Sequence, residues 1–246
     1  MWLLPLKACD APQLQLYCFP YGGAGPSLYK KWADAIDPAI QLVGVQLPGR
    51  ERRIKEPAFT QMRPLVKSLA KVWRHRPDLP YALFGHSLGA LVAYELILEL
   101  RRQGLPLPLR LIVSGSKAPH LNRHPEQING LPDAAFIEAI RQLGGTPEAV
   151  LQNELLMQVF LPVLRADFTL YENYHYEQNA PIDLPILACG GRSDREVSSS
   201  DLYAWSEHTE GAFDWQLFEG DHFYLDATPK LLIDYFTPFI QRHQNS

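Results

Sequence analysis

One serine of this chain lies in a pattern that supports nucleophilic chemistry. Residues 85–89 read GHSLG, which matches G-x-S-x-G, and they separate a short apolar run from a long amphipathic one. In that context the serine occupies a sharp strand-to-helix turn, where side chains do not fit at the two glycine positions. The pattern predicts that Ser87 is a nucleophile at the carboxyl end of a strand. It also predicts that the backbone N–H of Leu88, at the helix N-terminus, faces a developing oxyanion.

A serine hydroxyl is a weak nucleophile unless a histidine takes its proton and a carboxylate orients that histidine. Chains with this motif place the acid after the serine and the histidine last. Among the eight histidines, His222 meets this condition, because it follows a predicted strand at 214–218 and precedes the last predicted helix. His222 is therefore the expected base. We expect His86, the neighbour of the serine, to point elsewhere and to be structural.

The expected acid is Asp194. It stands in the stretch GGRSDREV at 190–197, directly after a predicted strand at 185–189, so it lies at the carboxyl end of that strand. Glu196 is the near competitor. Asp221 is adjacent to His222 and would have to fold back onto its own neighbour, so it is a poor orienting group.

Short apolar runs alternate with longer amphipathic ones along most of the chain, and this alternation must position the three side chains. Such an order is typical of an α/β layered domain around a mostly parallel sheet. The predicted strands are residues 13–19, 40–47, 81–84, 109–113, 185–189 and 214–218. The predicted helices are residues 27–36, 62–74, 88–103 and 229–243.

Residues 118–180 interrupt this rhythm. They contain several prolines and predict helices at 132–143, 147–152 and 154–171 with no strand between them. Because strands resume near 185, we interpret the segment as a helical insertion in a single domain spanning 1–246. Apolar residues recur at helical spacing in the last of these helices, which is typical of core packing and also fits the wall of a pocket. They are Met157, Phe160, Leu161, Leu164 and Phe168.

Composition excludes several classes of function. The net charge of −4 gives no reason to expect nucleic acid or an anionic membrane as a partner. The N-terminal stretch lacks the basic region of a signal peptide, and no apolar segment of about 18 residues predicts a membrane span. The three cysteines lack metal-ligand spacing, so we expect a reducing, cytoplasmic compartment with no disulfide and no metal.

Several further motifs accompany the serine, the acid and the histidine. They are FPYGGAG at 19–25, QLPGR at 46–50 with Arg53, GHSLGA at 85–90, SG at 114–115, APH at 118–120, LPVLRADF at 161–168 and GDHFY at 220–224. Together they make the chain resemble the type II thioesterases of polyketide and nonribosomal peptide synthesis, over nearly its whole length. The resemblance implies an α/β-hydrolase fold with a helical lid at 118–180.

The resemblance also implies an activity. Enzymes of this family are free-standing editing hydrolases that remove stalled or wrong acyl groups from the phosphopantetheine arm of acyl or peptidyl carrier proteins. The family's catalytic residues fall on Ser87, Asp194 and His222, and its oxyanion donors fall on the backbone of Leu88 and Gly22. No cofactor is implied, since the phosphopantetheine belongs to the carrier. Relatives often have Ala-Gly-Gly where this chain has Gly-Gly-Ala at 22–24, but a main-chain donor survives that change.

Other functions are compatible with parts of this pattern. A general carboxylesterase or lipase uses the same triad, and a medium-chain acyl thioesterase of fatty acid synthesis is a close relative. A non-catalytic binder of carrier proteins is disfavoured because no triad member is absent. The chain ends lack linker-like sequence, so we expect a free-standing enzyme, as a monomer. One further hypothesis is that the basic cluster from Arg50 to Arg53 meets an acidic helix of the carrier.

Overall fold

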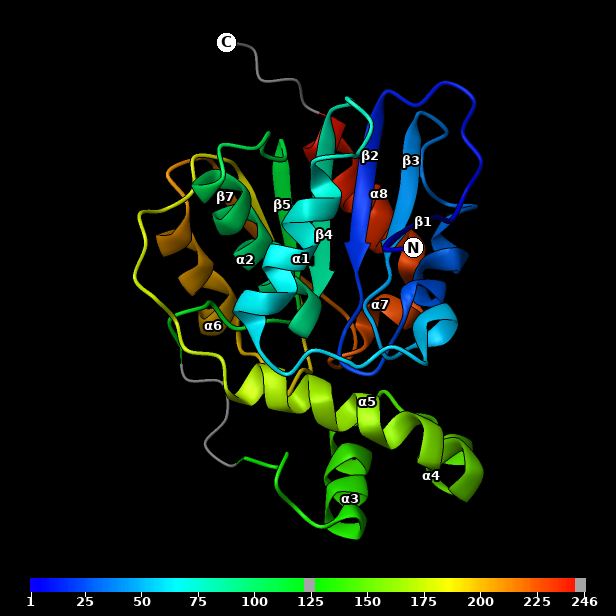
Figure 1. Ribbon diagram of the computed structural model, residues 1–246. Coiled ribbons are helices and arrows are strands. Elements are labelled where there is room, and N and C mark those ends of the chain that lie inside the picture. Colours follow the sequence, from blue (N-terminus) through cyan, green and yellow to red (C-terminus); the bar gives the residue numbers. More distant parts are fainter. Residues whose placement is uncertain (122–126, 242–246) are drawn as a thin grey trace.

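The computed structural model describes residues 1–121 and 127–241, which form a seven-stranded sheet flanked by helices (Figure 1). The strands are β1 (Leu3–Pro5), β2 (Leu14–Phe19), β3 (Ile40–Val45), β4 (Tyr81–His86), β5 (Arg110–Ser114), β6 (Ile186–Gly191) and β7 (Phe213–Phe218). Their order across the sheet is β1-β3-β2-β4-β5-β6-β7. Every pairing is parallel except that of β1 with β3, so the carboxyl ends of six strands meet at one edge.

Helices cover both faces of the sheet, which explains why its central strands are continuous apolar runs. Those beside the sheet are α1 (Met62–Trp73), α2 (Leu88–Arg102), α8 (Pro229–Gln241) and the 3-10 helix η1 (Pro26–Trp32). All residues of β2 and β4 are buried. Tyr17 of β2 packs in the core that includes α1 and α2, whereas Leu16 packs on the opposite face with η1 and α8. Figure 1 shows α1 and α2 in front of the sheet and α8 behind it.

The predicted strands are present, with ends that differ by one or two residues, and the predicted α/β class is confirmed. The helix predicted at 27–36 is instead the shorter η1, because the buried residues Pro26, Tyr29 and Trp32 recur every third position, the period of a 3-10 helix. Five short elements of the described residues were not predicted, because each is too short to show a periodic pattern. They are β1, the 3-10 helices η2 (Glu51–Arg53) and η3 (Ala204–His208), and the helices α6 (Ser199–Tyr203) and α7 (Tyr224–Ala227). The last two residues of the helix predicted at 229–243 lie outside the described residues.

The described residues between β5 and β6 form three helices, where the helical insertion was predicted. They are α3 (Asp133–Leu143), α4 (Glu148–Leu151) and α5 (Glu154–Glu172). Figure 1 shows α5 running across the carboxyl edge of the sheet, with α3 and α4 beyond it. Their buried side chains form a separate small core, which includes Met157 and Leu164 of the apolar stripe in α5. Phe160 of the same stripe is exposed.

Two of the three arginines in the basic cluster at 50–53 are buried, so the hypothesis that this cluster contacts a carrier is wrong for Arg50 and Arg53, whereas Arg52 is exposed. Only 4% of Arg50 and 7% of Arg53 is exposed. Arg53 donates to the carbonyl of Gln46 at 2.9 Å, and its guanidinium lies 4.0 Å above the ring of Trp2. Both guanidinium groups are committed to contacts within the protein.

Two further findings concern the chain as a whole. The three cysteines, Cys9, Cys18 and Cys189, are free thiols. Among the described residues, no helix is both long enough and apolar enough to cross a membrane.

Candidate active site

Ser87 occupies the turn between β4 and α2, in a strained backbone conformation. Its φ is 54° and its ψ is −119°, in the left-handed half of backbone space that non-glycine residues rarely adopt. The flanking glycines make the turn possible. A Cβ on Gly85 would lie 2.3 Å from the carbonyl oxygen of Gly89, and one on Gly89 would lie 2.2 Å from the carbonyl oxygen of Phe19. The Ser87 amide donates to the carbonyl of Ser114 in β5 at 2.8 Å, which fixes the turn to the sheet.

His222 and Asp194 meet directly, as predicted from their positions after β7 and β6. Nδ1 of His222 lies 2.8 Å from Oδ2 of Asp194, whose side chain is 0% exposed. The other oxygen, Oδ1, accepts from the amides of Glu196 at 2.8 Å and Val197 at 3.1 Å. The competing carboxylate Glu196 is exposed, and that of Asp221 accepts from the amide of Phe223 instead. Asp194 is thus the carboxylate that contacts the imidazole.

The loops that carry these two residues are held together by backbone hydrogen bonds. The amide of Arg192 donates to the carbonyl of Phe218 at 2.8 Å, and that of Ser193 donates to Gly220 at 2.8 Å. Gly191 permits this close approach, because a Cβ there would lie 2.0 Å from the carbonyl oxygen of Asp221. The distance between acid and base is therefore set by the backbone of two adjacent parallel strands.

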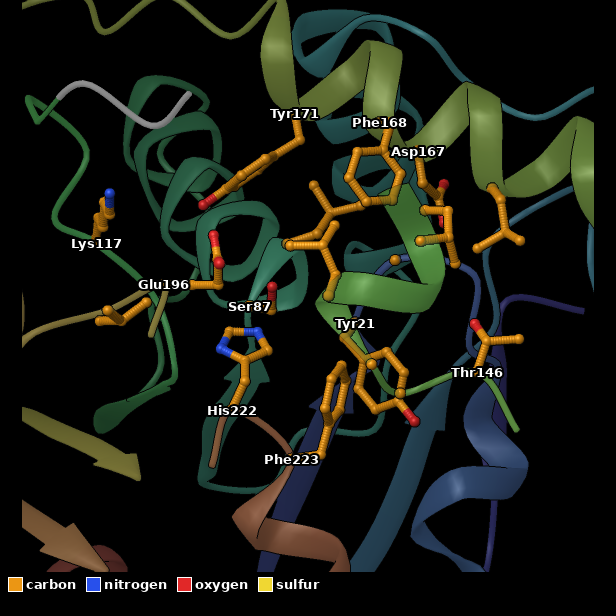
Figure 2. A pocket seen from close by; sticks show the side chains of 18 residues that line it. Tyr21, Ser87, Lys117, Thr146, Asp167, Phe168, Tyr171, Glu196, His222 and Phe223 are labelled. Carbon is orange, nitrogen blue, oxygen red and sulfur yellow. The ribbon is translucent and has the colours of Figure 1, made fainter. Parts of the chain in front are cut away.

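Ser87 and His222 line one cavity between the carboxyl edge of the sheet and the helices α3 and α5. Its volume is about 100 Å³. Figure 2 shows the Ser87 hydroxyl above the His222 ring, with Phe168 and Asp167 of α5 on one side and Lys117 and Glu196 on the other. The apolar wall consists of Ile140, Leu143, Leu164 and Phe168. The cavity thus combines a reactive polar centre with an apolar chamber.

The predicted oxyanion donors both line this cavity. Leu88 begins α2, so its amide has no partner within the helix and lies at the positive end of the helix dipole. The amide of Gly22 has no hydrogen-bond partner among residues 1–121 and 127–241. The neighbouring amide of Gly23 is already used, because it donates to Oδ2 of Asp167 at 2.7 Å. Of these two adjacent glycines, Gly22 is therefore the one whose amide is available.

His86 is a buried structural residue, as expected. Its Nδ1 lies 2.8 Å from Oγ of Ser114, which in turn lies 2.6 Å from the hydroxyl of Tyr224. Its ring centre is 5.0 Å from that of His222. Burial, followed by the nearby His222, lowers the pKa of His86 well below 6.5, so the ring is neutral at neutral pH. His86 therefore packs against the ring of His222 without adding a charge.

Several residues near the cavity were given no role inside the site. Arg50 and Asp167 form a buried ion pair. The sequence placed Arg50 only in the cluster expected to meet a carrier, and Asp167 only in a family motif. The ring of Phe223 lies against the loop between α3 and α4, where a Cβ on Gly145 would be 2.1 Å from it. Tyr21 packs against Phe223, and burial together with the negative Asp226 raises its pKa to about 12. These contacts link distant segments, which is why periodicity gave no signal for them.

The described residues offer no metal centre. In residues 1–121 and 127–241 there is no group of three or more His, Cys, Asp or Glu side chains that could hold a metal ion.

A mostly parallel sheet with a strained serine at a strand-to-helix turn, and with an Asp–His pair after later strands, defines the α/β-hydrolase fold class. The sequence model of the thioesterase-domain family matches residues 14–237, so the chain belongs to the thioesterase family. The motifs predicted a type II thioesterase, and the individual relatives confirm this prediction.

Three relatives are similar over nearly their full length. The gramicidin S biosynthesis protein GrsT of Aneurinibacillus migulanus is 36% identical, with 95% of this chain and 91% of GrsT covered. The thioesterase RedJ of the prodiginine pathway in Streptomyces coelicolor has a TM-score of 0.88 and 37% identity, with 94% of this chain and 92% of RedJ covered. The type II thioesterase BorB of the borrelidin cluster has a TM-score of 0.89 and 33% identity, with 98% of each chain covered. The chain is a type II thioesterase, an enzyme that hydrolyses thioesters.

Proposed function

We propose that this chain is an editing enzyme that removes stalled or wrong acyl groups from the phosphopantetheine arm of acyl or peptidyl carrier proteins in a polyketide or nonribosomal peptide pathway. The observation that carries the proposal is the Asp194–His222 contact of 2.8 Å at a cavity that Ser87 also lines. The similarity to GrsT, named for gramicidin S biosynthesis, and to BorB, a type II thioesterase of the borrelidin biosynthetic cluster, supports the choice of substrate.

The proposed reaction has two halves. His222 takes the proton of Ser87 as its oxygen attacks the thioester carbonyl, and Asp194 stabilises the imidazolium that forms. The amides of Leu88 and Gly22 stabilise the tetrahedral oxyanion. The C–S bond then breaks, His222 returns the proton to the sulfur, and the carrier leaves as the free thiol. In the second half His222 activates a water molecule, which releases the acyl group from Ser87 as a carboxylic acid.

The cavity suggests where the acyl group lies. The apolar side chains Ile140, Leu143, Leu164 and Phe168 form the wall beyond Ser87. We assign this chamber to the acyl group, and the helices α3, α4 and α5 to a lid, part of the insertion at 118–180 within a single domain of residues 1–246. The carrier protein is the expected partner. The enzyme needs no cofactor of its own, and we expect it to act as a monomer in the cytoplasm.

The test compares hydrolysis of one acyl group on two thiols. Acetyl and longer acyl groups are placed on an intact phosphopantetheinylated carrier protein and, separately, on a small thiol, with Ser87→Ala as the control. Faster release from the carrier, lost in Ser87→Ala, supports an editing enzyme that recognises its protein partner. Equal or faster hydrolysis of small oxygen esters, with the carrier ignored, contradicts the proposal and indicates a general esterase. Strong selectivity for long fatty acyl chains indicates instead a thioesterase of fatty acid synthesis.

A further inference from the structure

A buried ion pair joins the lid to the loop that carries the proposed oxyanion donor. Asp167 belongs to α5, whereas Arg50 follows β3, and 2% and 4% of these residues is exposed. Nη1 of Arg50 lies 2.7 Å from Oδ2 of Asp167, and Nη2 lies 2.8 Å from Oδ1. The two side chains therefore form a two-pronged contact, the strongest geometry for a guanidinium and a carboxylate.

The same carboxylate also holds the backbone of the loop at 21–25. Oδ2 of Asp167 accepts from the amide of Gly23 at 2.7 Å, and Nη1 of Arg50 donates to the carbonyl of Ala24 at 3.2 Å. The ion pair thus binds the amide of Gly23 and the carbonyl of Ala24, the two residues that follow Gly22. Because Asp167 also lines the cavity, this anchor lies next to the space in which the oxyanion forms.

The loop needs such an anchor because its sequence gives it great backbone freedom. Gly23 has a φ of 79°, a region that glycine enters easily and other residues do not. A Cβ on Gly23 would lie 2.4 Å from Cδ2 of Leu164, so α5 packs directly on this glycine. The amide of Ala24 donates to the carbonyl of Tyr21 at 3.1 Å, which closes the turn but leaves the peptide between Gly22 and Gly23 able to flip. Without a fixed partner for the Gly23 amide, that flip would change the backbone at Gly22 and turn its amide away from the cavity.

We infer that Asp167 is a positioning residue: together with Arg50 it fixes the loop so that the Gly22 amide points at the developing oxyanion. The inference rests on the proposed active site and goes one step beyond it. The lid helix α5 then does more than cover the acyl group, because it supplies the side chain that completes the oxyanion hole. Displacement of α5 from the sheet would release the Gly23 amide and disable the hole.

The test separates positioning from simple structural support by means of three variants. Asp167→Asn removes the charge and weakens the anchor. Arg50→Met combined with Asp167→Leu replaces both charges with apolar groups of similar size, a change that often leaves stability intact when an ion pair is buried. Asp133→Asn is the matched control, because it breaks another ion pair of the lid, between Asp133 and Arg165 at 2.7 Å, that does not touch the loop.

The readouts are kcat and KM for a small acyl thioester, the affinity for an alkylboronic acid, and the melting temperature. The boronic acid forms a tetrahedral adduct with the serine and so reports on the oxyanion hole. We expect kcat and boronate affinity to fall about 30-fold or more in Asp167→Asn and in the double variant, as for loss of one oxyanion donor, while KM changes little. The melting temperature is expected to fall in Asp167→Asn and to recover in the double variant.

Two outcomes overturn the inference. If kcat recovers together with the melting temperature in the double variant, Asp167 supports the fold and nothing more. If Asp133→Asn lowers kcat as much as Asp167→Asn, general integrity of the lid explains the effect. Ser87→Ala in the same assay keeps the two proposals apart. A fully active Ser87→Ala overturns the active site and this inference with it, whereas an inactive Ser87→Ala beside an unimpaired Asp167→Asn overturns this inference alone.

Discussion

Asp194 divides its two carboxylate oxygens between the imidazole of His222 and its own loop. Oδ2 lies 2.8 Å from Nδ1 of His222, and Oδ1 accepts from the amides of Glu196 and Val197. An ionised carboxylate only accepts, so Nδ1 of His222 carries the proton, and Nε2 is left able to accept the proton of Ser87 in the proposed reaction. The loop amides hold the carboxylate in place, and the carboxylate in turn sets the tautomer that proton transfer from Ser87 requires.

Substitution of Asp194 by Asn is expected to lower kcat by about 1,000-fold or more, because an amide does not enforce that tautomer or stabilise the imidazolium. Glu196→Gln is the matched control, since Glu196 lies two residues away, lines the same cavity and does not contact His222. It is expected to keep kcat within about 3-fold of the wild-type value. Steady-state hydrolysis of a small thioester measures both. A loss in Glu196→Gln that exceeds the loss in Asp194→Asn would show that the acid has been assigned to the wrong carboxylate, and equal losses would contradict a specific role for Asp194.

Gly85 is expected to tolerate no side chain. In Gly85→Ala the new Cβ would lie 2.3 Å from the carbonyl oxygen of Gly89, within a backbone that has no room to move. We expect the free energy of unfolding to fall by about 3 kcal/mol, at the upper end for an overpacked site, and activity to fall with it. Gly130→Ala is the control, because a Cβ there meets nothing within 4 Å. Urea unfolding compares the two, and a Gly85→Ala variant as stable as Gly130→Ala would contradict the proposed geometry of the turn.

Most of the fold was predictable because its elements are periodic and long. Strands buried on both faces appear in the sequence as short apolar runs, and α2 is an uninterrupted helix pattern that ends before Gly104. The missed helix α6 does carry a local signal, a capping box formed by Ser198 and Asp201, but it is only five residues long. Two other elements that differ from the prediction owe their structure to neighbours and not to their own sequence. The edge strand β1 exists because Leu3, Leu4 and Pro5 pair with β3, and η1 is shaped by its buried rings.

The site was predictable in so far as chain order alone determines it. In a parallel sheet, residues just after β4, β6 and β7 must meet at one edge, so Ser87, Asp194 and His222 follow from the strand assignment. The Arg50–Asp167 contact could not be predicted from the order of the strands. The two residues are 117 positions apart, and neither lies in a strand of the sheet. Arg50 and Asp167 are both buried, although charged side chains are mostly exposed, so composition gave no reason to expect the contact.

The apolar chamber is expected to set the preference for acyl length. Ile140 is buried and lines the cavity, so Ile140→Phe places a ring in a space of about 100 Å³. We expect the ratio of kcat/KM for an octanoyl thioester to that for an acetyl thioester to fall about 10-fold, the usual effect of a few methylene groups in an apolar pocket. Val159→Phe is the control, because Val159 is exposed on the outer side of α5. A fall that is the same for both acyl groups would place the acyl chain elsewhere.

The buried His86 is expected to make stability depend on pH. Its pKa in the folded protein is well below 6.5, whereas that of a histidine in the unfolded chain is near this value. Below about pH 6.5 the unfolded chain therefore binds a proton that the folded protein does not, and the free energy of unfolding falls as the pH falls. Above that pH neither state binds the proton, and His86 contributes no pH dependence.

The measurement is urea unfolding of the wild type and of His86→Asn between about pH 5 and pH 8. Asparagine places an amide where Nδ1 contacts Ser114 but does not titrate. The variant is expected to be less stable at every pH, because it leaves a cavity. The difference in unfolding free energy between the wild type and the variant should become smaller below about pH 6.5, by up to about 1.4 kcal/mol per pH unit. The reason is that only the wild type loses stability through protonation of this histidine in the unfolded chain. The exposed His75, changed to Asn, controls for the loss of a histidine as such. If the plots of unfolding free energy against pH are parallel for the wild type and His86→Asn, His86 takes up its proton in the folded protein. The ring that packs against His222 would then be positively charged at acidic pH.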